Sequence, residues 1–420
     1  MENKDNKNIN NETETNTSKV EKMLDAQSAQ IRANSSSKKR KFFDVDLSLV
    51  ALLILALGAF GLAYAMQQSS VGLQAMEIIG LVILDIVLGI IVYNAGKILF
   101  GYLTGYRLSF ISFLGICIYF KEKVKVTYDI SYFFELRLSM VPRRNQDNPN
   151  PLLMFLGGII FFAICAAVVI GISFMSIGKS MQSILFYSIG FASLIPIYEL
   201  LPLKYGNRND MFLLIFTSHD NDKLAYNNYL VNRHLDRIGE NYQPIQLDSY
   251  DNSRVASWTI LPNVQNKILE KDYPAALKLI ELAEAHDYVL PDYQTVETGY
   301  AKAFCYIAQK RTNECDDLAQ ILNKKAKNAE DFHPSLATLR TMILMTATVE
   351  NSLEATKDAI QGFVKKCDQL DYSPMCKVNL DIVNSFIPSI NSKHPDWKLQ
   401  PVSFSEAKAK REEKSSDDEY

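Results

Sequence analysis

Histidine is absent from the first 218 residues of this sequence. All five histidines of the 420-residue chain come later: His219, His234, His286, His333 and His394. The N-terminal half therefore has no imidazole for a histidine-based metal site or for a Ser–His or Cys–His nucleophile pair. The later histidines show no zinc-ligand spacing, so we interpret them as ordinary surface or half-buried residues.

An excess of charge and a cysteine framework are also absent. The 44 basic and 47 acidic residues give a net charge of −3, which provides no electrostatic reason to expect a nucleic-acid partner. The six cysteines have no metal-ligand spacing and are not concentrated in a short domain. We expect reduced thiols and no cofactor.

Long apolar runs are plentiful, and all of them lie between residues 47 and 201. A transmembrane helix needs about 20 apolar residues. Four runs approach or exceed that length, at 47–66, 76–100, 152–177 and 184–201. The shorter run at 108–120 is rich in β-forming residues and is not counted. The sequence predicts a mainly α-helical, multi-pass membrane protein with about four transmembrane helices in a lipid bilayer.

The loops between these runs differ in charge. Basic residues cluster at 38–41 and throughout 107–150, whereas the other two loops together contain only Lys179. Basic loops stay on the cytosolic side of a membrane. We therefore expect the cell membrane, with both termini and the 107–150 loop in the cytosol.

Composition divides the chain into four parts. Residues 1–41 are polar and are expected to be disordered, 42–215 form the membrane domain, 216–400 a soluble helical domain, and 401–420 a charged tail. Within the membrane domain, the alternating residues of 107–150 predict a small β-hairpin at the cytosolic face. The alternative for this loop is an apolar surface segment without strands.

The soluble half contains a weak internal repeat. Polar turns followed by apolar residues at helical spacing begin near residues 271, 310 and 348, a period of about 39 residues. This favours an array of α-hairpins similar to tetratricopeptide repeats over an ordinary helical bundle. Such arrays bind peptides or proteins, so we expect a protein or peptide partner there.

The segment IVYNAGKILFGYLTGYRLSF resembles the signature helix of the site-2 protease family of intramembrane zinc metalloproteases. In that helix, H-E-x-G-H precedes a small-residue run and a Gly-Tyr-Lys/Arg turn. Tyr93 takes the place of the first histidine, Asn94 that of the glutamate and Lys97 that of the second histidine, while Gly96 matches the pattern.

Further segments resemble the family in the same order, so that the resemblance covers roughly residues 75–215. The segment ending at Pro151 is similar to the family's Met-x-Pro segment, and LLMFLGGII to its Gly-Gly region. IYELLPLKYGNRNDMFLL resembles the N-x-x-P…N-D-G segment, so that Asn209 and Asp210 occupy motif positions. Met211 stands where glycine is usual. The resemblance implies that Asp210 corresponds to the third zinc ligand.

The replaced residues argue against activity. Zinc in such a site needs two imidazoles and a carboxylate, and the motif glutamate acts as general base. Tyrosine, asparagine and lysine at these positions supply neither the two imidazole ligands nor the general base. We expect a pseudoprotease that holds no metal and has no catalytic residues. Catalysis by a different mechanism is the one enzymatic alternative that stays open.

Four polar residues of the predicted spans remain to be explained. Lys97 either pairs with Asp210 in place of the metal or extends toward the cytosolic surface. Asp85 is either an ion or substrate contact or a hydrogen-bonded packing residue. Glu199 lies near two prolines, where the helix is expected to unwind.

Two functions fit these patterns. The first is a non-catalytic membrane scaffold or regulator that binds a peptide or membrane-protein partner in peptide processing, export or immunity. The alternative is a transporter of a small ligand or ion that uses Asp85.

Overall fold

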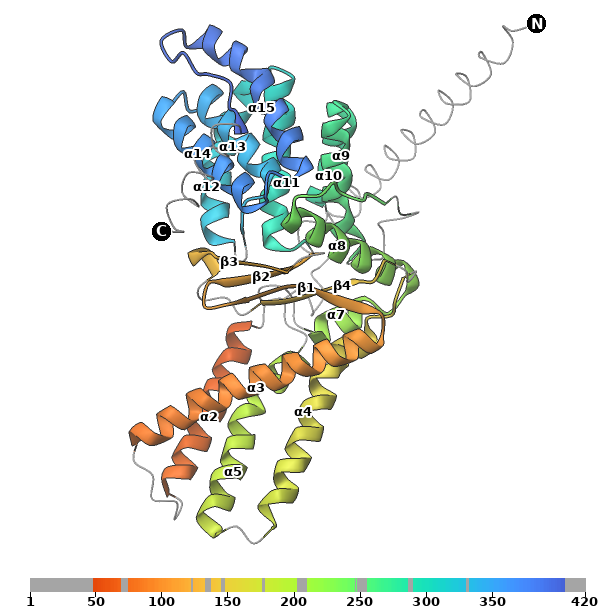
Figure 1. Ribbon diagram of the computed structural model, residues 1–420, viewed down its shortest axis with the longest axis vertical. Helices are drawn as coiled ribbons and strands as arrows, with labels where there is room; N and C mark the ends of the chain where they lie inside the picture. The colour runs from red at the N-terminus through yellow and green to blue at the C-terminus, as the bar shows by residue number, and fades with distance from the viewer. Residues whose placement is uncertain are drawn as a thin grey trace, which may run out of the picture.

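The computed structural model describes residues 48–68, 75–121, 124–132, 137–144, 148–175, 178–201, 210–245, 247, 255–285, 290–329 and 332–404. Within these ranges the fold is mainly helical, as predicted. Apolar helices form one end, a small antiparallel sheet lies in the middle, and a second group of helices forms the other end (Figure 1). The predicted tail 1–41, residues 405–420 and Asn209 lie outside the described residues.

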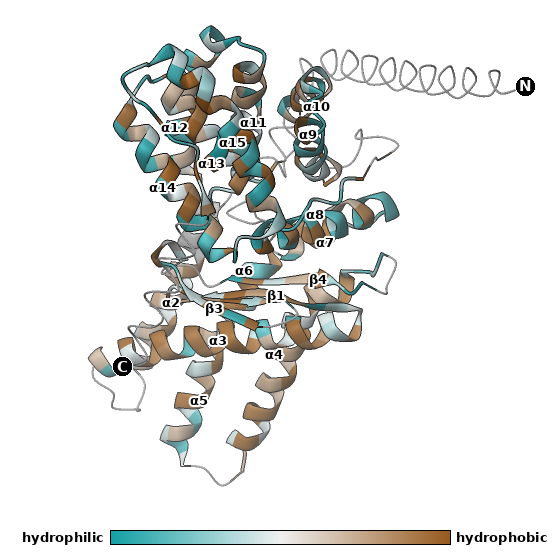
Figure 2. Ribbon diagram, turned by 45° about the horizontal axis from the view of Figure 1, so that its top comes forward, coloured by the Kyte–Doolittle hydropathy of each residue, from teal (hydrophilic) through white to brown (hydrophobic). Residues whose placement is uncertain are grey.

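The apolar end consists of α2 (Ser48–Gln68), α3 (Ala75–Leu103), α4 (Leu152–Ser173), α5 (Lys179–Ala192) and α6 (Leu194–Leu200). Three helical stretches are long and apolar enough to cross a membrane, at Met76–Leu103, Leu152–Ser173 and Lys179–Leu200. They coincide with three of the predicted spans. The remaining prediction falls on α2, a helix of 21 residues, in which the part with described side chains forms the apolar stretch Leu55–Gln67. Figure 2 shows the apolar character of these helices in brown.

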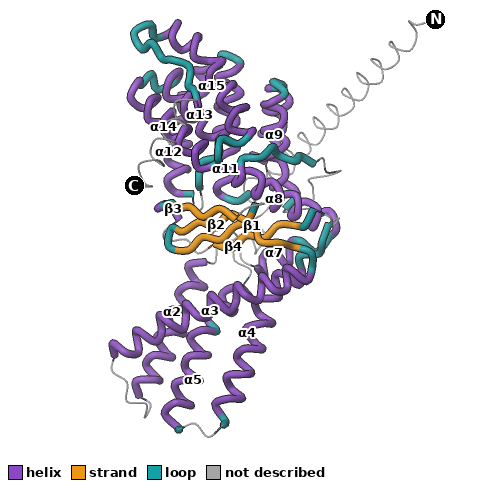
Figure 3. The backbone as a smooth tube through the Cα atoms, viewed as in Figure 1, coloured by secondary structure: helices purple, strands orange, loops and turns teal. Residues whose placement is uncertain are grey.

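The loop at 107–150 forms a larger sheet than the predicted hairpin. Its four antiparallel strands are β1 (Tyr106–Phe113), β2 (Ile116–Phe120), β3 (Val124–Tyr128) and β4 (Arg137–Pro142), in the order β3-β2-β1-β4 (Figure 3). The sheet is therefore small and antiparallel as expected, and the alternative of a loop without strands is wrong. The hairpin β1–β2 gains a strand on each edge because β3 and β4 also pair.

Two local features give β1 its shape. Leu114 and Gly115, which join β1 to β2, both have positive φ, as a tight two-residue hairpin turn requires. The pairing of β1 with β4 shifts in register between Leu108 and Phe110, so Ser109 is an extra residue in β1. This bulge turns the Ser109 hydroxyl toward His234 of a following helix, at 2.7 Å from Nδ1.

Beyond the sheet, α7 (Asp210–Phe216) leads into α8 (Asp220–Ile238). The helical end then comprises α9 (Ile260–Leu269), α10 (Tyr273–Ala285), α11 (Asp292–Ala308), α12 (Asp316–Asn328), α13 (Leu336–Thr348), α14 (Leu353–Gln369) and α15 (Pro374–Lys393). Lys271, Lys310 and Asn351 have positive φ in the turns α9–α10, α11–α12 and α13–α14. These left-handed residues are 39 and 41 apart, so the turns recur with nearly the period seen in the sequence.

The sheet joins the two groups of helices. The hydroxyl of Tyr106 in β1 donates to Asn227 Oδ1 of α8 at 2.7 Å, and the Tyr132 ring stacks on His333 with 3.8 Å between centroids. One buried apolar core contains Met154 of α4, Phe212 of α7 and Trp258. The core therefore crosses the expected domain boundary at residue 215.

Candidate functional site

Close packing of α3 on α4 positions the motif residues. A Cβ added to Gly96 would lie 2.5 Å from the carbonyl oxygen of Gly157, and one added to Gly158 would lie 2.6 Å from the Tyr93 ring. The helices approach this closely because both contribute glycine at the contact. Tyr93 and Lys97 are four residues apart and so lie on one face of α3.

Asp210, the first residue of α7, meets that face. Its Oδ1 accepts from the Lys97 ammonium at 2.7 Å, and its Oδ2 accepts from the Tyr93 hydroxyl at 2.6 Å. The side chains of Asp210 and Lys97 are 5 % and 19 % exposed. Of the two arrangements considered for Lys97, the structure has the ion pair with Asp210, and the ammonium does not extend toward the surface.

The other motif positions are arranged differently. Glu199 of α6 accepts from the backbone N–H of Asp210 at 2.9 Å, which satisfies a donor that the first turn of a helix leaves open. Asn94 donates to the carbonyl of Ile90 on its own helix at 2.9 Å. The site therefore gathers Tyr93, Lys97, Asp210 and Glu199, whereas Asn94 bonds within α3.

Asp85 is separate from this cluster. It lies twelve residues before Lys97, about 18 Å along the helix. Its side chain is hydrogen-bonded to Ser188 of α5 and is 4 % exposed. Its Oδ2 is buried without a hydrogen-bond partner among the described residues.

The donor set at the motif does not suit a divalent metal. Both oxygens of Asp210 already accept hydrogen bonds, and the Lys97 ammonium would repel a second cation. Among the described residues, no three His, Cys, Asp or Glu side chains are grouped as metal ligands. What the cluster can do is join α3 to α7 through a buried ion pair.

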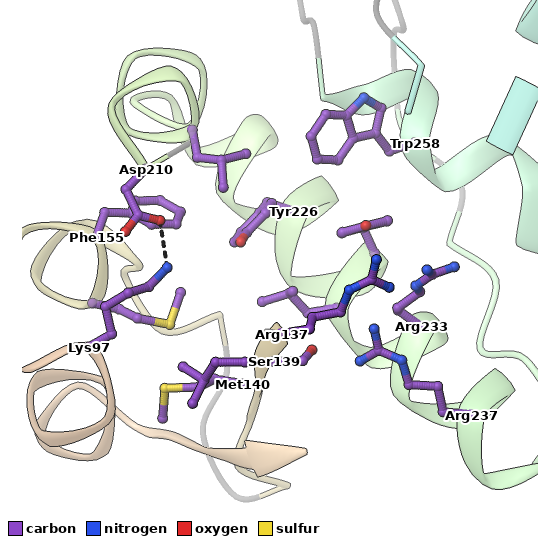
Figure 4. A pocket seen from close by; sticks show the side chains of 15 residues that line it. Lys97, Arg137, Ser139, Met140, Phe155, Asp210, Tyr226, Arg233, Arg237 and Trp258 are labelled. Atoms are coloured by element: carbon purple, nitrogen blue, oxygen red, sulfur yellow. Dashed lines mark hydrogen bonds and ion pairs between the residues drawn. The ribbon is translucent and has the colours of Figure 1, made fainter. Parts of the chain in front are cut away.

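A cavity of about 130 Å³ opens beside the ion pair, between α3, α4, β4 and α8 (Figure 4). Lys97 and Asp210 line one side, and Arg137, Arg233 and Arg237 line the other. The three arginines were not predicted as site residues. The only sequence signal was the spacing of Arg233 and Arg237, which are neighbours on one helix face.

Basic residues also surround His234, which belongs to α8. Burial, together with the nearby Arg107, Arg237, Lys121 and Arg144, lowers the pKa of His234 to about 4. The imidazole is therefore neutral at pH 7. Among the described histidines, His219 is exposed and His333 and His394 are half-buried, as expected, whereas His234 is buried.

Comparison of the chain with known protein families, with curated proteins and with solved structures finds no match. The geometry of the site alone therefore carries the functional argument.

Proposed function

We propose that this chain is a non-catalytic membrane scaffold whose core resembles an intramembrane metalloprotease and whose cytosolic half binds a protein partner. The observation that carries the proposal is the contact between the Lys97 ammonium and Asp210. In an active relative, that aspartate and a histidine at position 97 would bind zinc. Here a permanent cation occupies the histidine position, so a buried ion pair replaces the metal bonds.

Restoring the histidines tests this origin of the site. The double variant Tyr93→His, Lys97→His should bind one zinc per chain, because two imidazoles at i and i+4 would then face Asp210. A matched control is Leu84→His, Leu88→His, which has the same spacing on an exposed part of α3. Metal analysis of tag-free protein measures all three chains. One tightly held zinc in the unaltered protein would contradict the proposal.

The proposed topology has four spans, formed by α2, α3, α4 and the α5–α6 pair, with the sheet and the helical end in the cytosol. Large exposed apolar side chains on these helices support it, Phe60, Ile83 and Val168 among them. An impermeant maleimide added to intact cells should label Ser180→Cys, in the first turn of α5, and should not label Ser392→Cys in α15. The reverse pattern would contradict the orientation.

The proposed partner site is a groove of about 1740 Å³ between the sheet and α8. Five basic residues line it: Arg107, Lys121, Lys125, Arg143 and Arg144. Lys125 is paired with Asp371, and Arg143 donates to backbone carbonyls. Within the described part of the chain, Arg107, Lys121 and Arg144 have no ion-pair partner and are the cations proposed to contact a ligand. This charge favours an acidic segment of a partner protein.

Peptide binding tests the groove directly. A fluorescent glutamate-rich peptide should bind the full chain in nanodiscs, and its glutamine counterpart should not. Changing Arg107, Lys121 and Arg144 to Gln should abolish binding, whereas the same change at three exposed lysines, Lys324, Lys357 and Lys365, should not. Equal loss in both triple variants would indicate nonspecific charge attraction and would contradict the groove.

One observation favours the alternative of a transporter. The Asp85 carboxyl is buried in an apolar helix and one of its oxygens has no hydrogen-bond partner among the described residues. Such a group is a candidate ion contact. In proteoliposomes, an ion flux that Asp85→Asn abolishes would establish transport. A chain without flux, in which Asp85→Asn leaves peptide binding intact, supports the scaffold.

A further inference from the structure

The arginine wall of the cavity has no part in the proposed function. Its three arginines come from β4 and from two successive turns of α8: Arg137, Arg233 and Arg237. Figure 4 shows their guanidinium groups turned toward one another across the cavity wall. Guanidinium groups repel one another because they have the same charge, so the surrounding fold must hold them in place.

Aromatic rings hold the three guanidinium groups in place. The guanidinium carbon lies 3.7 Å from the Tyr293 ring centroid for Arg233, 4.5 Å from that of Phe110 for Arg237 and 6.0 Å from that of Tyr132 for Arg137. These distances are within the range of cation–π contacts. A ring covers the flat face of a guanidinium and leaves its in-plane N–H groups available for an acceptor.

Two described carboxylates lie near this wall, and each is engaged by other groups. Glu297 interacts with Arg233, and its burial raises its own pKa to about 7. Asp210, on the opposite side of the cavity, is already bonded to Lys97 and Tyr93. For Arg237, burial and the repulsion from Arg233 and Arg137 lower the pKa to about 10. Among the described residues that line the cavity, Lys97 and the three arginines therefore outnumber Asp210, the one carboxylate.

Arg237 also has an unused donor. Its Nη1 is buried and has no hydrogen-bond partner among the described residues. A buried donor of a charged group that lacks an acceptor is costly. A cavity therefore lies beside clustered guanidinium groups, and at least one of their N–H groups lacks an acceptor.

We propose that this cavity binds a phosphate group, held by the guanidinium groups of Arg137, Arg233 and Arg237. Planar guanidinium forks donate pairs of hydrogen bonds to phosphate oxygens, and a phosphate monoester carries close to two negative charges at pH 7. A singly charged carboxylate would leave more of the cluster uncompensated. The phosphate belongs either to a soluble ligand or to a lipid headgroup, since the cavity adjoins the apolar helices.

Thermal unfolding of the full chain in phosphatidylcholine nanodiscs provides the test. Inorganic phosphate should raise the melting temperature more than sodium chloride at equal ionic strength. Arg237→Met should weaken phosphate binding roughly ten- to a hundredfold, as expected for a lost charged hydrogen bond. Arg311→Met is the matched control, because Arg311 also stacks on a tyrosine but is exposed and paired with Glu314.

A second set of nanodiscs, containing phosphatidic acid and no added phosphate, separates the two sources. Stabilisation there alone assigns the phosphate to a lipid, and stabilisation by inorganic phosphate alone assigns it to a soluble ligand. Without phosphate, Arg237→Met should be at least as stable as the unaltered chain, since it removes a buried cation. Absence of stabilisation in both sets, or a less stable Arg237→Met that still binds phosphate, would overturn the proposal.

Discussion

The two sides of the cavity hold cations in different ways. On the side of the apolar helices, Lys97 is bonded directly to the Asp210 carboxylate at 2.7 Å. On the opposite side, Arg237 stacks on Phe110 and retains a buried N–H that finds no acceptor in the described part of the chain. Removing one partner of a buried ion pair leaves the other charge uncompensated and destabilises the protein, whereas removing a buried cation that lacks a carboxylate partner leaves no such charge behind. We therefore expect Lys97 to stabilise the fold and Arg237 to serve the proposed phosphate binding.

The largest predicted effect separates these two cations. Lys97→Met should destabilise the protein by about 3–5 kcal/mol, because it leaves the Asp210 carboxylate buried without its counter-charge. Arg237→Met should cost nothing in the absence of ligand. Unfolding of both variants in nanodiscs measures the difference, with the exposed Lys357→Met as control. Equal losses at positions 97 and 237 would remove the distinction.

Protonation of His234, which lines the groove, should place a further positive charge beside Arg107, Arg237, Lys121 and Arg144. Its pKa is about 4 in the fold and about 6.5 when unfolded, so the unfolded state binds more protons between these values. The contribution of His234 to the free energy of unfolding is therefore fully present above pH 6.5. It decreases as the pH falls toward 4, and about 2 kcal/mol is lost at pH 5.

The variant His234→Asn isolates this effect. The pKa of Glu297 is raised to about 7, so this residue lowers the stability of the protein as the pH rises. Both chains contain Glu297, and its effect cancels when their stabilities are subtracted. The unaltered protein should lose more stability than His234→Asn between pH 7 and pH 5. Parallel curves would show that His234 is not held neutral.

Close contact between α3 and α4 should be needed to position the Lys97–Asp210 ion pair. Gly96→Ala would place a methyl group against the Gly157 carbonyl and should cost about 1–3 kcal/mol. Gly80→Ala, on the same helix, meets no atom within 4 Å and should be neutral or slightly stabilising. If Gly96→Ala and Gly80→Ala have the same melting temperature, the two helices are not in contact at Gly96.

The smallest effect is expected at the exposed pair between Lys125 of β3 and Asp371, whose side chains are 25 % and 51 % exposed. Solvent screens such pairs, so Asp371→Asn should cost less than about 1 kcal/mol. A loss comparable to that of Lys97→Met, measured in the same unfolding assay, would show that exposure does not distinguish the two pairs.

Residues with a strong local pattern were the ones that the sequence could place. Apolar runs located α3, α4 and the α5–α6 helix, and the i, i+4 spacing of Tyr93 and Lys97 placed both on the face that meets Asp210. The strand β4 was missed as a partner of β1, because pairing depends on contacts between residues about 30 positions apart. Ser109 was likewise unpredictable as a bulge, since the register shift exists only once both strands are paired.

The arginine cluster shows the limit of sequence reasoning most clearly. Arg233 and Arg237 have the spacing of an ordinary solvated helix face, and nothing in α8 indicates that the sheet covers it. Arg137 joins them only through the fold, almost a hundred residues earlier in the chain. Burial of charge is a tertiary property, so the cavity became visible only in three dimensions.

Exchange of the two charges at the motif tests the central claim most directly. Lys97→Asp and Asp210→Lys should each destabilise the protein, because each places two like charges together. The double variant restores one cation and one carboxylate within the same site. Unfolding of the single variants, the double variant and the unaltered chain in nanodiscs completes the cycle. The ion-pair account predicts that the double variant recovers most of the lost stability, and a double variant no more stable than the single variants would contradict it.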